Sequence, residues 1–353
     1  MEKILTIVIP TYNMQDYLRR CLDSLIVPEE QMKHLEVLVV NDGSKDNSSA
    51  IAHEYQDKYP DTFRVIDKEN GNYGSCVNRG LKEATGKYIK ILDADDWFDT
   101  WGLYNFILKL FSVNVDVVVT DFAIVNANSN RNKKWKISFP SYTTMSLKEV
   151  MYYTPIGIVM HAICYRTNLL KEISYVQPEG ISYTDQIWIN EPLAKAKEII
   201  YFPILVYKYL IGREGQTVDP KISLKNIKHH IECALVMVKS IDSVQKNTVS
   251  WDFLTNRAVH TTKNIYMMFL NSENPDIELL DAFDKNIEIL NKELYDSLNH
   301  VVLHPLIKLH YIKNWRIDHS YKFGWCEKLM LKCSSILYKF ICRKKDKYSC
   351  ISL

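Results

Sequence analysis

The chain has 353 residues, of which 47% are hydrophobic and 24% charged, with a formal net charge of +2. This length suits one large domain or two smaller ones, and the composition excludes a disordered or collagen-like chain. The eight cysteines include no CxxC pair and no Cys/His set at zinc spacing, so neither a disulfide framework nor a zinc site is expected. Free thiols in a reducing compartment are predicted instead.

Charge is unevenly spread along the chain. Residues 301–353 hold 11 Lys and Arg against 3 acidic residues, whereas the rest is mildly acidic. A basic end predicts contact with something anionic, with a merely solvated tail as the alternative. The start, MEKILTIVIP, has no signal-peptide pattern, and no apolar run approaches the roughly 18 residues that a spanning helix needs. We expect a cytoplasmic protein that either stays free or contacts the inner face of a membrane peripherally, and no nucleic-acid partner.

Strands and helices alternate over the first 110 residues. Short, continuous apolar runs bounded by turn residues predict buried strands at 4–9, 35–40, 63–67 and 87–92. Helical spacing follows the first run at 14–26, a turn leads into a helix after the second, and a helix is predicted over 73–84. This alternation predicts an α/β fold with a mostly parallel sheet that has helices on both faces.

The pattern changes after residue 110. Strands are predicted at 115–125 and 199–211, a hairpin tip at 126–136, and helices at 147–153 and 183–197. Helical periodicity dominates from 221 onward, with breaks at 271–275 and 304–305. We therefore predict two parts: a domain over 1–220 and a helical C-terminal region over 221–353.

Three polar clusters follow predicted strands: PTYN (10–13), NDGSKD (41–46) and DADD (93–96). In parallel sheets, ligands bind beyond the carboxyl ends of the strands, so these clusters should share one rim. The spacing Asp93-x-Asp95 lets both carboxylates reach one hard cation, Mg²⁺ or Mn²⁺, which would neutralise a diphosphate. No P-loop lysine motif and no GxGxxG are present, which argues against a Walker-type ATPase and a dinucleotide-binding dehydrogenase.

TIVIPTYN, VLVVNDGSKDNS, NGNYGSCVNRG and GKYIKILDADD, in this order, resemble the family 2 glycosyltransferases of bacterial surface-polysaccharide type. The resemblance covers about the first 215 residues. It implies the GT-A fold, a Rossmann-like sheet flanked by helices, followed here by the helical C-terminal region. Within it, 1–110 would be the nucleotide-binding half and 111–220 the acceptor-binding half.

The resemblance also implies the nucleotide contacts: Pro10, Thr11, Tyr12, Asn13, Asp42, Asn78, Asp93 and Ala94. Asp42 would accept the imide hydrogen of uracil, with a plain turn-forming role as its alternative. Tyr12 has loop packing as its alternative. Val77 stands where the family often has Arg, so one polar contact expected to the sugar-diphosphate has no matching residue. Arg79 is the alternative source of that contact. Lys68 is either a nucleotide contact or a solvated lysine.

The remaining roles follow from the same resemblance. Asp95 would be the main metal ligand, with Asp93, and Arg213 would bind the diphosphate. Asp185 would be the catalytic base, with an N-cap of the helix that holds Trp188 as its alternative, and Thr184 stands where the family often has Glu. Trp188 would stack on the acceptor, with core packing as an equal alternative.

Three further residues have mainly structural interpretations. Asp96 is undecided between the site and a helix cap, and Asp99 is predicted to cap the next helix. His161 could face the acceptor, but a structural histidine is favoured.

The function implied is inverting transfer of a sugar, from a UDP-sugar or another nucleotide donor, to a hydroxyl of a glycan, which we expect to be lipid-linked. The QxxRW signature of processive synthases is absent, so one sugar is expected per encounter. A nucleotidyltransferase and an inactive scaffold of the same fold are the alternatives. A basic amphipathic helix predicted over 325–343 would contact an anionic membrane, pack on its own domain, or form a homodimer.

Overall fold

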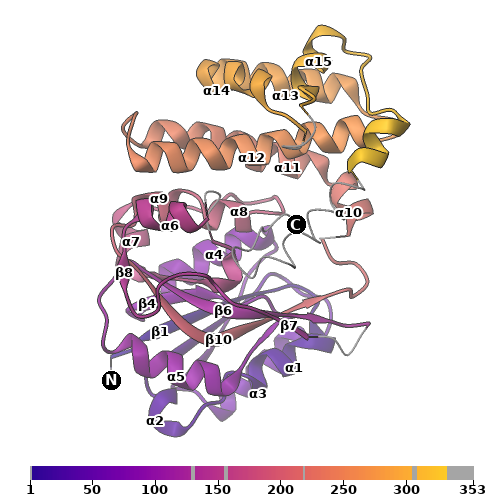
Figure 1. Ribbon diagram of the computed structural model, residues 1–353. Coiled ribbons are helices and arrows are strands. Elements are labelled where there is room, and N and C mark those ends of the chain that lie inside the picture. Colours follow the sequence, from indigo (N-terminus) through magenta and orange to yellow (C-terminus); the bar gives the residue numbers. More distant parts are fainter. Residues whose placement is uncertain (1, 129–131, 155–157, 218, 304–307, 332–353) are drawn as a thin grey trace. The chain divides into compact units, whose positions relative to one another are not determined.

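The computed structural model describes residues 2–128, 132–154, 158–217, 219–303 and 308–331 (Figure 1). The chain divides into two compact units, Met1–Ile222 and Ser223–Leu353. Among the described residues, five cysteines are free thiols, and no helix is long and apolar enough to cross a membrane.

A single sheet forms the centre of the first unit. Its described strands are β1 (Leu5–Thr11), β2 (Leu35–Asn41), β3 (Phe63–Asp67), β4 (Tyr88–Ile91), β5 (Trp97–Phe98), β6 (Val117–Asn126), β7 (Asn132–Trp135), β8 (Thr144–Met145), β9 (Ile163–Arg166) and β10 (Ile199–Ile211). They follow the order β3-β2-β1-β4-β9-β6-β10-β5, with β7 paired to β6 and β8 to β10. Strands β3, β2, β1 and β4 are parallel, as are β6 and β10, while β9 runs antiparallel between them.

Helices cover both faces of this sheet, which confirms the predicted α/β fold. They are α1 (Gln15–Asp23), α2 (Glu29–Met32), α3 (Ser48–Lys58), α4 (Asn72–Glu83), α5 (Thr100–Leu110), α6 (Leu147–Tyr153), α7 (Thr167–Glu172), α8 (Asp185–Trp188) and α9 (Glu191–Lys195). Figure 1 shows α1, α2, α3 and α5 on one face and α4 with α6 to α9 on the other. Because helices cover both faces, all seven residues of β1 are buried, which explains its continuous apolar run.

The structure corrects one predicted helix. The single helix expected over 183–197 is two short helices, α8 and α9. Asn190 has non-helical angles (φ −100°, ψ −91°), and Pro192 lies in the first turn of α9. Proline has no N–H to donate to the preceding turn, so it starts a helix here and does not continue one.

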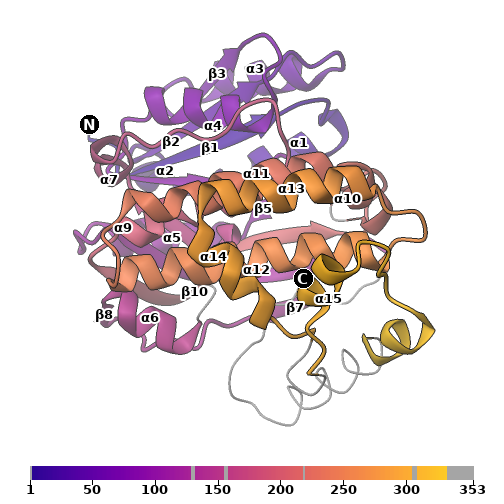
Figure 2. The ribbon, with the colours of Figure 1, turned by 90° about the horizontal axis from the view of Figure 1, so that it is seen from above.

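The second unit is helical, as its periodicity predicts. Its helices are α11 (Ile227–Ser240), α12 (Val249–Asn271), α13 (Ile277–Leu290), α14 (Lys292–Ser297) and α15 (Tyr311–Ile317), with α10 (Pro220–Lys225) at the boundary between the units. Figure 2 shows α11 lying beside both α12 and α13. The predicted break at 271–275 separates α12 from α13, whereas the one at 304–305 lies outside the described residues.

Candidate functional site

The acidic loop lies between β4 and β5. Its turn is closed by a hydrogen bond from the backbone N–H of Asp96 to the carbonyl of Asp93. The turn separates the four aspartates of residues 93–99 into different surroundings. Asp99 caps α5 by accepting a hydrogen bond from the N–H of Gly102 at 2.9 Å, which confirms its predicted capping role.

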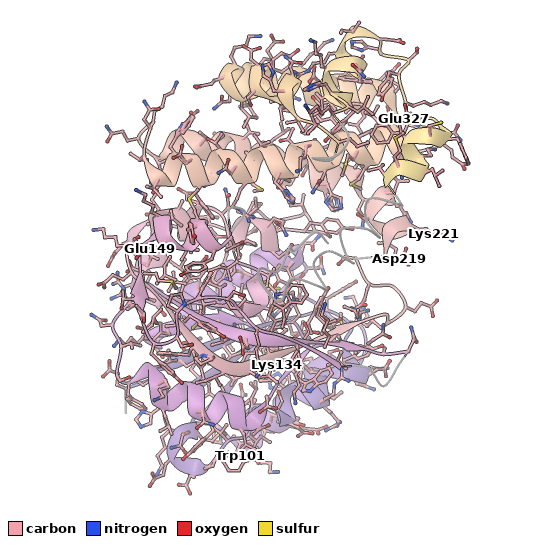
Figure 3. All side chains as sticks on the ribbon, in the orientation of Figure 1. Trp101, Lys134, Glu149, Asp219, Lys221 and Glu327 are labelled. Carbon is pink, nitrogen blue, oxygen red and sulfur yellow. The ribbon has the colours of Figure 1, made fainter. Side chains whose placement is uncertain are left out.

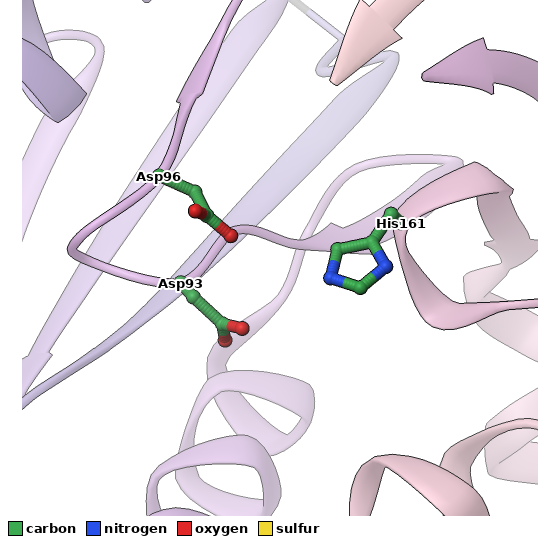
Figure 4. A group of neighbouring side chains, drawn as sticks. All are labelled: Asp93, Asp96 and His161. Carbon is green, nitrogen blue, oxygen red and sulfur yellow. The ribbon is translucent and has the colours of Figure 1, made fainter. Parts of the chain in front are cut away.

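Asp93, Asp96 and His161 form a three-residue group, which we call the acidic cluster. One ligand atom from each residue lies within 4.8 Å of the other two. Figure 4 shows the two aspartates on one loop and His161 on the 3-10 turn Met160–Ala162, with the side chains facing a common space. The three groups are close enough for one cation to contact all of them.

Two tyrosines hold the carboxylates of the acidic cluster in place. The hydroxyl of Tyr207, on β10, donates to Asp96 at 2.7 Å and accepts from the backbone N–H of Asp93 at 3.2 Å. The hydroxyl of Tyr73, on α4, donates to Asp93 at 2.8 Å. The N–H of Leu210 donates to the other oxygen of Asp96 at 2.7 Å. The cluster is therefore held by α4 and β10 from two sides.

Burial leaves the negative charge of the acidic cluster poorly compensated. Burial, together with the charge of Asp95, raises the pKa of Asp93 to about 7. Burial and the neighbouring carboxylates also raise the pKa of Asp96 well above its usual value. Among the described residues, neither Asp93 nor Asp96 takes part in an ion pair. A bound cation would supply the missing positive charge.

His161 is neutral in this setting. Burial, and next to it the charge of Lys90, lowers the pKa of His161 to about 3. Its ring stacks on Tyr209, with the ring centroids 4.1 Å apart. The ammonium of Lys90 donates to the backbone carbonyls of His161 and Ile163 at 2.8 and 2.9 Å, which fixes the turn. A neutral imidazole with a lone pair is the form that ligates metals.

This set of side chains fits a divalent cation. Two carboxylates suit Mg²⁺ or Mn²⁺, and an imidazole ligand favours the transition metal of the two. The sequence favoured a structural role for His161, and no spacing signal connects it to the DADD run. Only the pairing of β9 with β4 and β6 brings the turn before β9 to the acidic loop.

Asp95 lies outside the acidic cluster, which differs from its predicted place as the main metal ligand. Its carboxylate accepts a hydrogen bond from Nε of Arg213 at 2.6 Å. Gln216 lies 3.5 Å from the same oxygen. The side-chain oxygen of Gln216 also accepts from the N–H of Gly212, whose φ of 85° favours glycine. The loop that follows β10 is thus fastened to the acidic loop.

The first two polar clusters meet at the same rim. The N–H of Asp42 donates to the carbonyl of Thr11, and Asn13 pairs with the 44–45 turn. Asp42 is only 2% exposed, and its carboxylate accepts from Lys68 at 2.5 Å and from the N–H of Gly71 at 2.9 Å. Tyr12 is 47% exposed, so its ring is open to a ligand.

Three other predicted nucleotide contacts have little side-chain surface to offer. Pro10, Thr11 and Ala94 are buried, so only their backbone can reach a nucleotide. Asn78 accepts from the N–H of Gln177 at 2.7 Å and donates to the carbonyl of Gln177 and to Glu179. Both ends of this amide are therefore occupied within the protein, which does not fit a direct nucleotide contact.

Asp185 is the first residue of α8 and is half-buried. Its charge contributes to raising the pKa values of Asp93, Tyr73 and Tyr209, which places its carboxylate near the acidic cluster. Gln186 donates to it at 3.1 Å. The position fits a base that faces a ligand bound at the cluster.

The predicted acceptor contact of Trp188 is wrong. Its side chain is fully buried, with its ring edge-on to Tyr165 and Tyr175 at centroid distances of 5.2 and 5.6 Å. No ring face is left for a sugar. The alternative, core packing, is what the structure shows, because the residue lies on the inward side of a single-turn helix.

Comparison with known proteins identifies the type of domain. A family model described as Glycosyl transferase family 2 matches residues 6–173. Poly(ribitol-phosphate) beta-N-acetylglucosaminyltransferase TarS of Staphylococcus aureus (strain MW2) is 25% identical over 329 residues, which cover 90% of this chain and 56% of TarS. Poly(ribitol-phosphate) beta-glucosyltransferase of Bacillus spizizenii is 29% identical over 218 residues, 60% of this chain and 33% of that protein. The chain thus spans little more than half the length of TarS.

Solved structures share the fold. The crystal structure of S. aureus TarS 1-349 in complex with UDP-GlcNAc matches with a TM-score of 0.65 at 22% identity, covering 89% of this chain and 88% of that one. A mannosyltransferase from Pyrobaculum calidifontis, in complex with GDP-Man and Mn2+, matches with a TM-score of 0.50 at 14% identity, covering 91% and 88%. At these identities the likeness establishes the GT-A fold.

Proposed function

We propose that the chain, whose residues 6–173 match the Glycosyl transferase family 2 model, transfers a sugar from a nucleotide donor to a hydroxyl group of a glycan, with inversion at the anomeric carbon. The observation that carries the proposal is the convergence of the acidic cluster, Asp185 and Arg213 around one loop of the first unit. Residues 1–110 would bind the nucleotide and 111–220 the acceptor.

The donor is a nucleoside diphosphate sugar, with a UDP-sugar as the first candidate. TarS, which has been crystallised with UDP-GlcNAc, supports this choice of nucleotide. Asp42 and the exposed ring of Tyr12 lie at the strand ends where a base would bind. Asp93, Asp96 and His161 would hold Mn²⁺ or Mg²⁺. When bound, that ion would offset the charge that develops on the leaving diphosphate.

Asp185 is the base in this proposal. The acceptor hydroxyl oxygen attacks the anomeric carbon, the bond from that carbon to the diphosphate oxygen breaks, and the nucleoside diphosphate leaves with the bonding electrons. The hydroxyl proton passes to the carboxylate of Asp185. Because attack and departure occur on opposite faces of the sugar, one displacement inverts the configuration.

Arg213 would change partners when the donor binds. Its guanidinium is now paired with Asp95, and its Cζ atom lies 5.4 Å from the ring centroid of Tyr17. A diphosphate offers the guanidinium a stronger, bidentate anionic partner. The exchange would draw the loop after β10 toward the donor and free the carboxylate of Asp95 beside the acidic cluster. Asp95 would then be available as a metal ligand, the role in which the sequence predicts it as the main one.

The acceptor would be a glycan of bacterial surface-polysaccharide synthesis, carried on a lipid at the cytoplasmic face of the membrane. The names of the poly(ribitol-phosphate) transferases support this setting. Residues 325–331 are helical and expose Trp325, Leu329 and Met330. An exposed aromatic and aliphatic surface next to a basic end would bind an anionic membrane peripherally, with a homodimer as the alternative. Residues 332–343 of the predicted helix lie outside the described ones.

The proposal is tested by incubating the full chain with a panel of UDP-sugars and Mn²⁺ and measuring release of UDP. We expect release with one donor, stimulation by a glycan acceptor, and its loss in Asp185→Asn. Exchange of pyrophosphate into the donor would instead identify a nucleotidyltransferase. If Asp185→Asn and Asp96→Asn left cellular glycan unchanged, the chain would be an inactive scaffold.

A further inference from the structure

A hollow of about 590 Å³ lies beside β5 and β10, lined by residues from α1, β5, the start of α5 and β10. Its volume falls within the range of about 300–1,000 Å³ that small-molecule sites occupy. Successive side chains of a strand point to opposite faces of the sheet. Tyr207 of β10 contacts the acidic cluster, whereas its neighbour Lys208 lines the hollow. The hollow is therefore a separate place from the proposed reaction centre.

The charges that line the hollow balance one another. Lys208 is paired with Asp99 at 2.9 Å. Arg20 donates to the backbone carbonyl of Asp95 at 2.8 Å, and its guanidinium lies 3.8 Å from the ring centroid of Trp97. Asp23 accepts a hydrogen bond from Tyr55 at 2.6 Å. Two cations and two carboxylates leave no net charge, so neither a phosphate nor a metal ion is favoured as the ligand.

Two tryptophans give the hollow its aromatic surface. Trp101, which Figure 3 labels at the surface of the first unit, is 69% exposed. The rings of Trp101 and Tyr104 are nearly perpendicular, with their centroids 5.5 Å apart, and most of Trp101 remains exposed to solvent. Trp97 is partly exposed and also lines the hollow. A large aromatic ring that is mostly exposed commonly marks a binding surface.

This combination matches the chemistry of a sugar ring. A pyranose presents apolar C–H groups on its faces and hydroxyl groups around its edge. The indole of Trp101 offers an apolar face on which the C–H groups can pack. Lys208, Asp99 and Thr100 offer hydrogen-bond donors and acceptors for the hydroxyl groups. A neutral, open and partly aromatic hollow thus suits a saccharide better than a charged cofactor.

We propose that this hollow is a second saccharide site, which binds neutral sugar rings of a glycan away from the reaction centre. The choice of ligand rests on the proposed function, since a glycosyltransferase meets glycans. Holding a distal part of a glycan raises the effective concentration of its reacting end. A long acceptor would therefore be used at lower concentrations than a short one.

Fluorine-19 NMR of the full chain labelled with 5-fluorotryptophan tests binding directly. Trp97→Phe and Trp101→Phe assign the two signals, and chitotetraose and maltotetraose are the probes. We expect both signals to shift saturably with one of these probes. Trp325 is the matched control, because its ring is 76% exposed and it does not line the hollow. No shift with either probe, or an equal shift of the Trp325 signal, overturns the proposal.

Kinetics of Trp101→Ala provide the second measurement. We expect KM for a polymeric acceptor to rise about tenfold, the size of loss that removing a tryptophan anchor commonly causes, with kcat and KM for the donor unchanged. Circular dichroism checks that the variant is folded. An unchanged KM for the polymer overturns the proposal. If the wild-type chain were a dimer and Trp101→Ala made it a monomer, the hollow would be a protein interface, and the proposal would also be overturned. If the wild-type chain released no UDP, the proposed function would fail, while the NMR titration would still report on saccharide binding.

Discussion

Asp284, a buried carboxylate of the second unit, and the two carboxylates of the acidic cluster in the first unit have opposite surroundings. In the second unit, the Asp284 carboxylate pairs with the guanidinium of Arg316 at 2.7 Å and also accepts from the hydroxyl of Tyr266. In the first unit, Asp93 and Asp96 accept hydrogen bonds from tyrosines and backbone but, among the described residues, have no cationic partner. Hydrogen bonds alone orient a carboxylate without neutralising it. The difference separates an acid that is neutralised within the fold from acids that have no cationic partner among the described residues.

The largest effect on transfer should come from the base. Asp185→Asn keeps the shape of the side chain and removes its ability to take a proton, so transfer should slow by about 10²- to 10⁴-fold. Donor binding should change little, because Asp185 is proposed to act on the acceptor. Single-turnover rates and calorimetric titration with the UDP-sugar measure the two quantities. A comparable loss of donor affinity would contradict the assignment.

Asp284→Asn should have the largest effect on stability. The substitution leaves the buried guanidinium of Arg316 without its carboxylate, which should lower the free energy of unfolding by about 3–5 kcal/mol. Urea unfolding, monitored by circular dichroism, measures the loss.

Asp96→Asn is the matched substitution within the acidic cluster. Asparagine can still accept from the N–H of Leu210, and a neutral side chain removes both the cost of burying a charge and the repulsion by neighbouring carboxylates, which together raise the pKa of Asp96. The free energy of unfolding should therefore change by less than about 1 kcal/mol, while transfer slows, though less than in Asp185→Asn. A destabilisation as large as that of Asp284→Asn would show that the cluster is structural and would remove the basis of the comparison.

Substitution of Arg213, near the acidic loop, should affect donor binding, whereas substitution of Arg166, which is paired elsewhere in the first unit, should not. Arg213→Met should raise KM for the UDP-sugar about tenfold or more, since a charge-assisted hydrogen bond contributes about 1.5–3 kcal/mol. Arg166 provides the control, because it too is paired with an aspartate, Asp116, at 2.7 Å. Arg166→Met should leave KM unchanged. Equal effects of the two variants on KM would mean that Arg213 acts through the fold.

The smallest expected effect is on the pH dependence of stability, through the ion-paired carboxylate of Asp116. Burial alone would raise the pKa of Asp116, but hydrogen bonds from the Lys197 N–H and Arg166 outweigh it and lower the pKa. A lowered pKa in the folded state contributes stability above the unfolded value, near 4, and this is lost as the pH falls through the folded value. Asp116→Asn should flatten the acid limb of the stability curve. Parallel acid limbs in thermal scans would contradict this.

The strands were predictable because the signal for each one lies within its own short stretch of sequence. A continuous apolar run with turn residues at both ends identifies a strand buried on two faces, and β3 has the predicted bounds. The single helix over 183–197 failed at Pro192, a breaker visible in the sequence. The prediction that Trp188 contacts the acceptor was wrong because aromatic residues at helical spacing occur both in cores and at ligand sites. Only the packing of Trp188 against Tyr165 and Tyr175 distinguishes the two roles.

The sequence predicted at which edge of the sheet the candidate site lies, but not which side chains come together there. Parallel topology alone brings the DADD run to a ligand-binding edge. Which aspartate faces the ligand depends on the turn between Asp93 and Asp96, and on the loop that brings Arg213 to Asp95. His161 reaches the cluster through an antiparallel strand inserted into the sheet. Non-local pairing of this kind leaves no spacing pattern in the sequence.

Binding of Mn²⁺ to the full chain in the presence of UDP tests the central claim most directly. Electron paramagnetic resonance of free Mn²⁺ measures the bound fraction. The account predicts saturable binding to the wild-type chain, loss of binding in Asp96→Asn, and binding retained in Asp284→Asn under conditions where that variant is folded. Equal binding by the wild-type chain and Asp96→Asn would contradict the claim that the acidic cluster is a cation site.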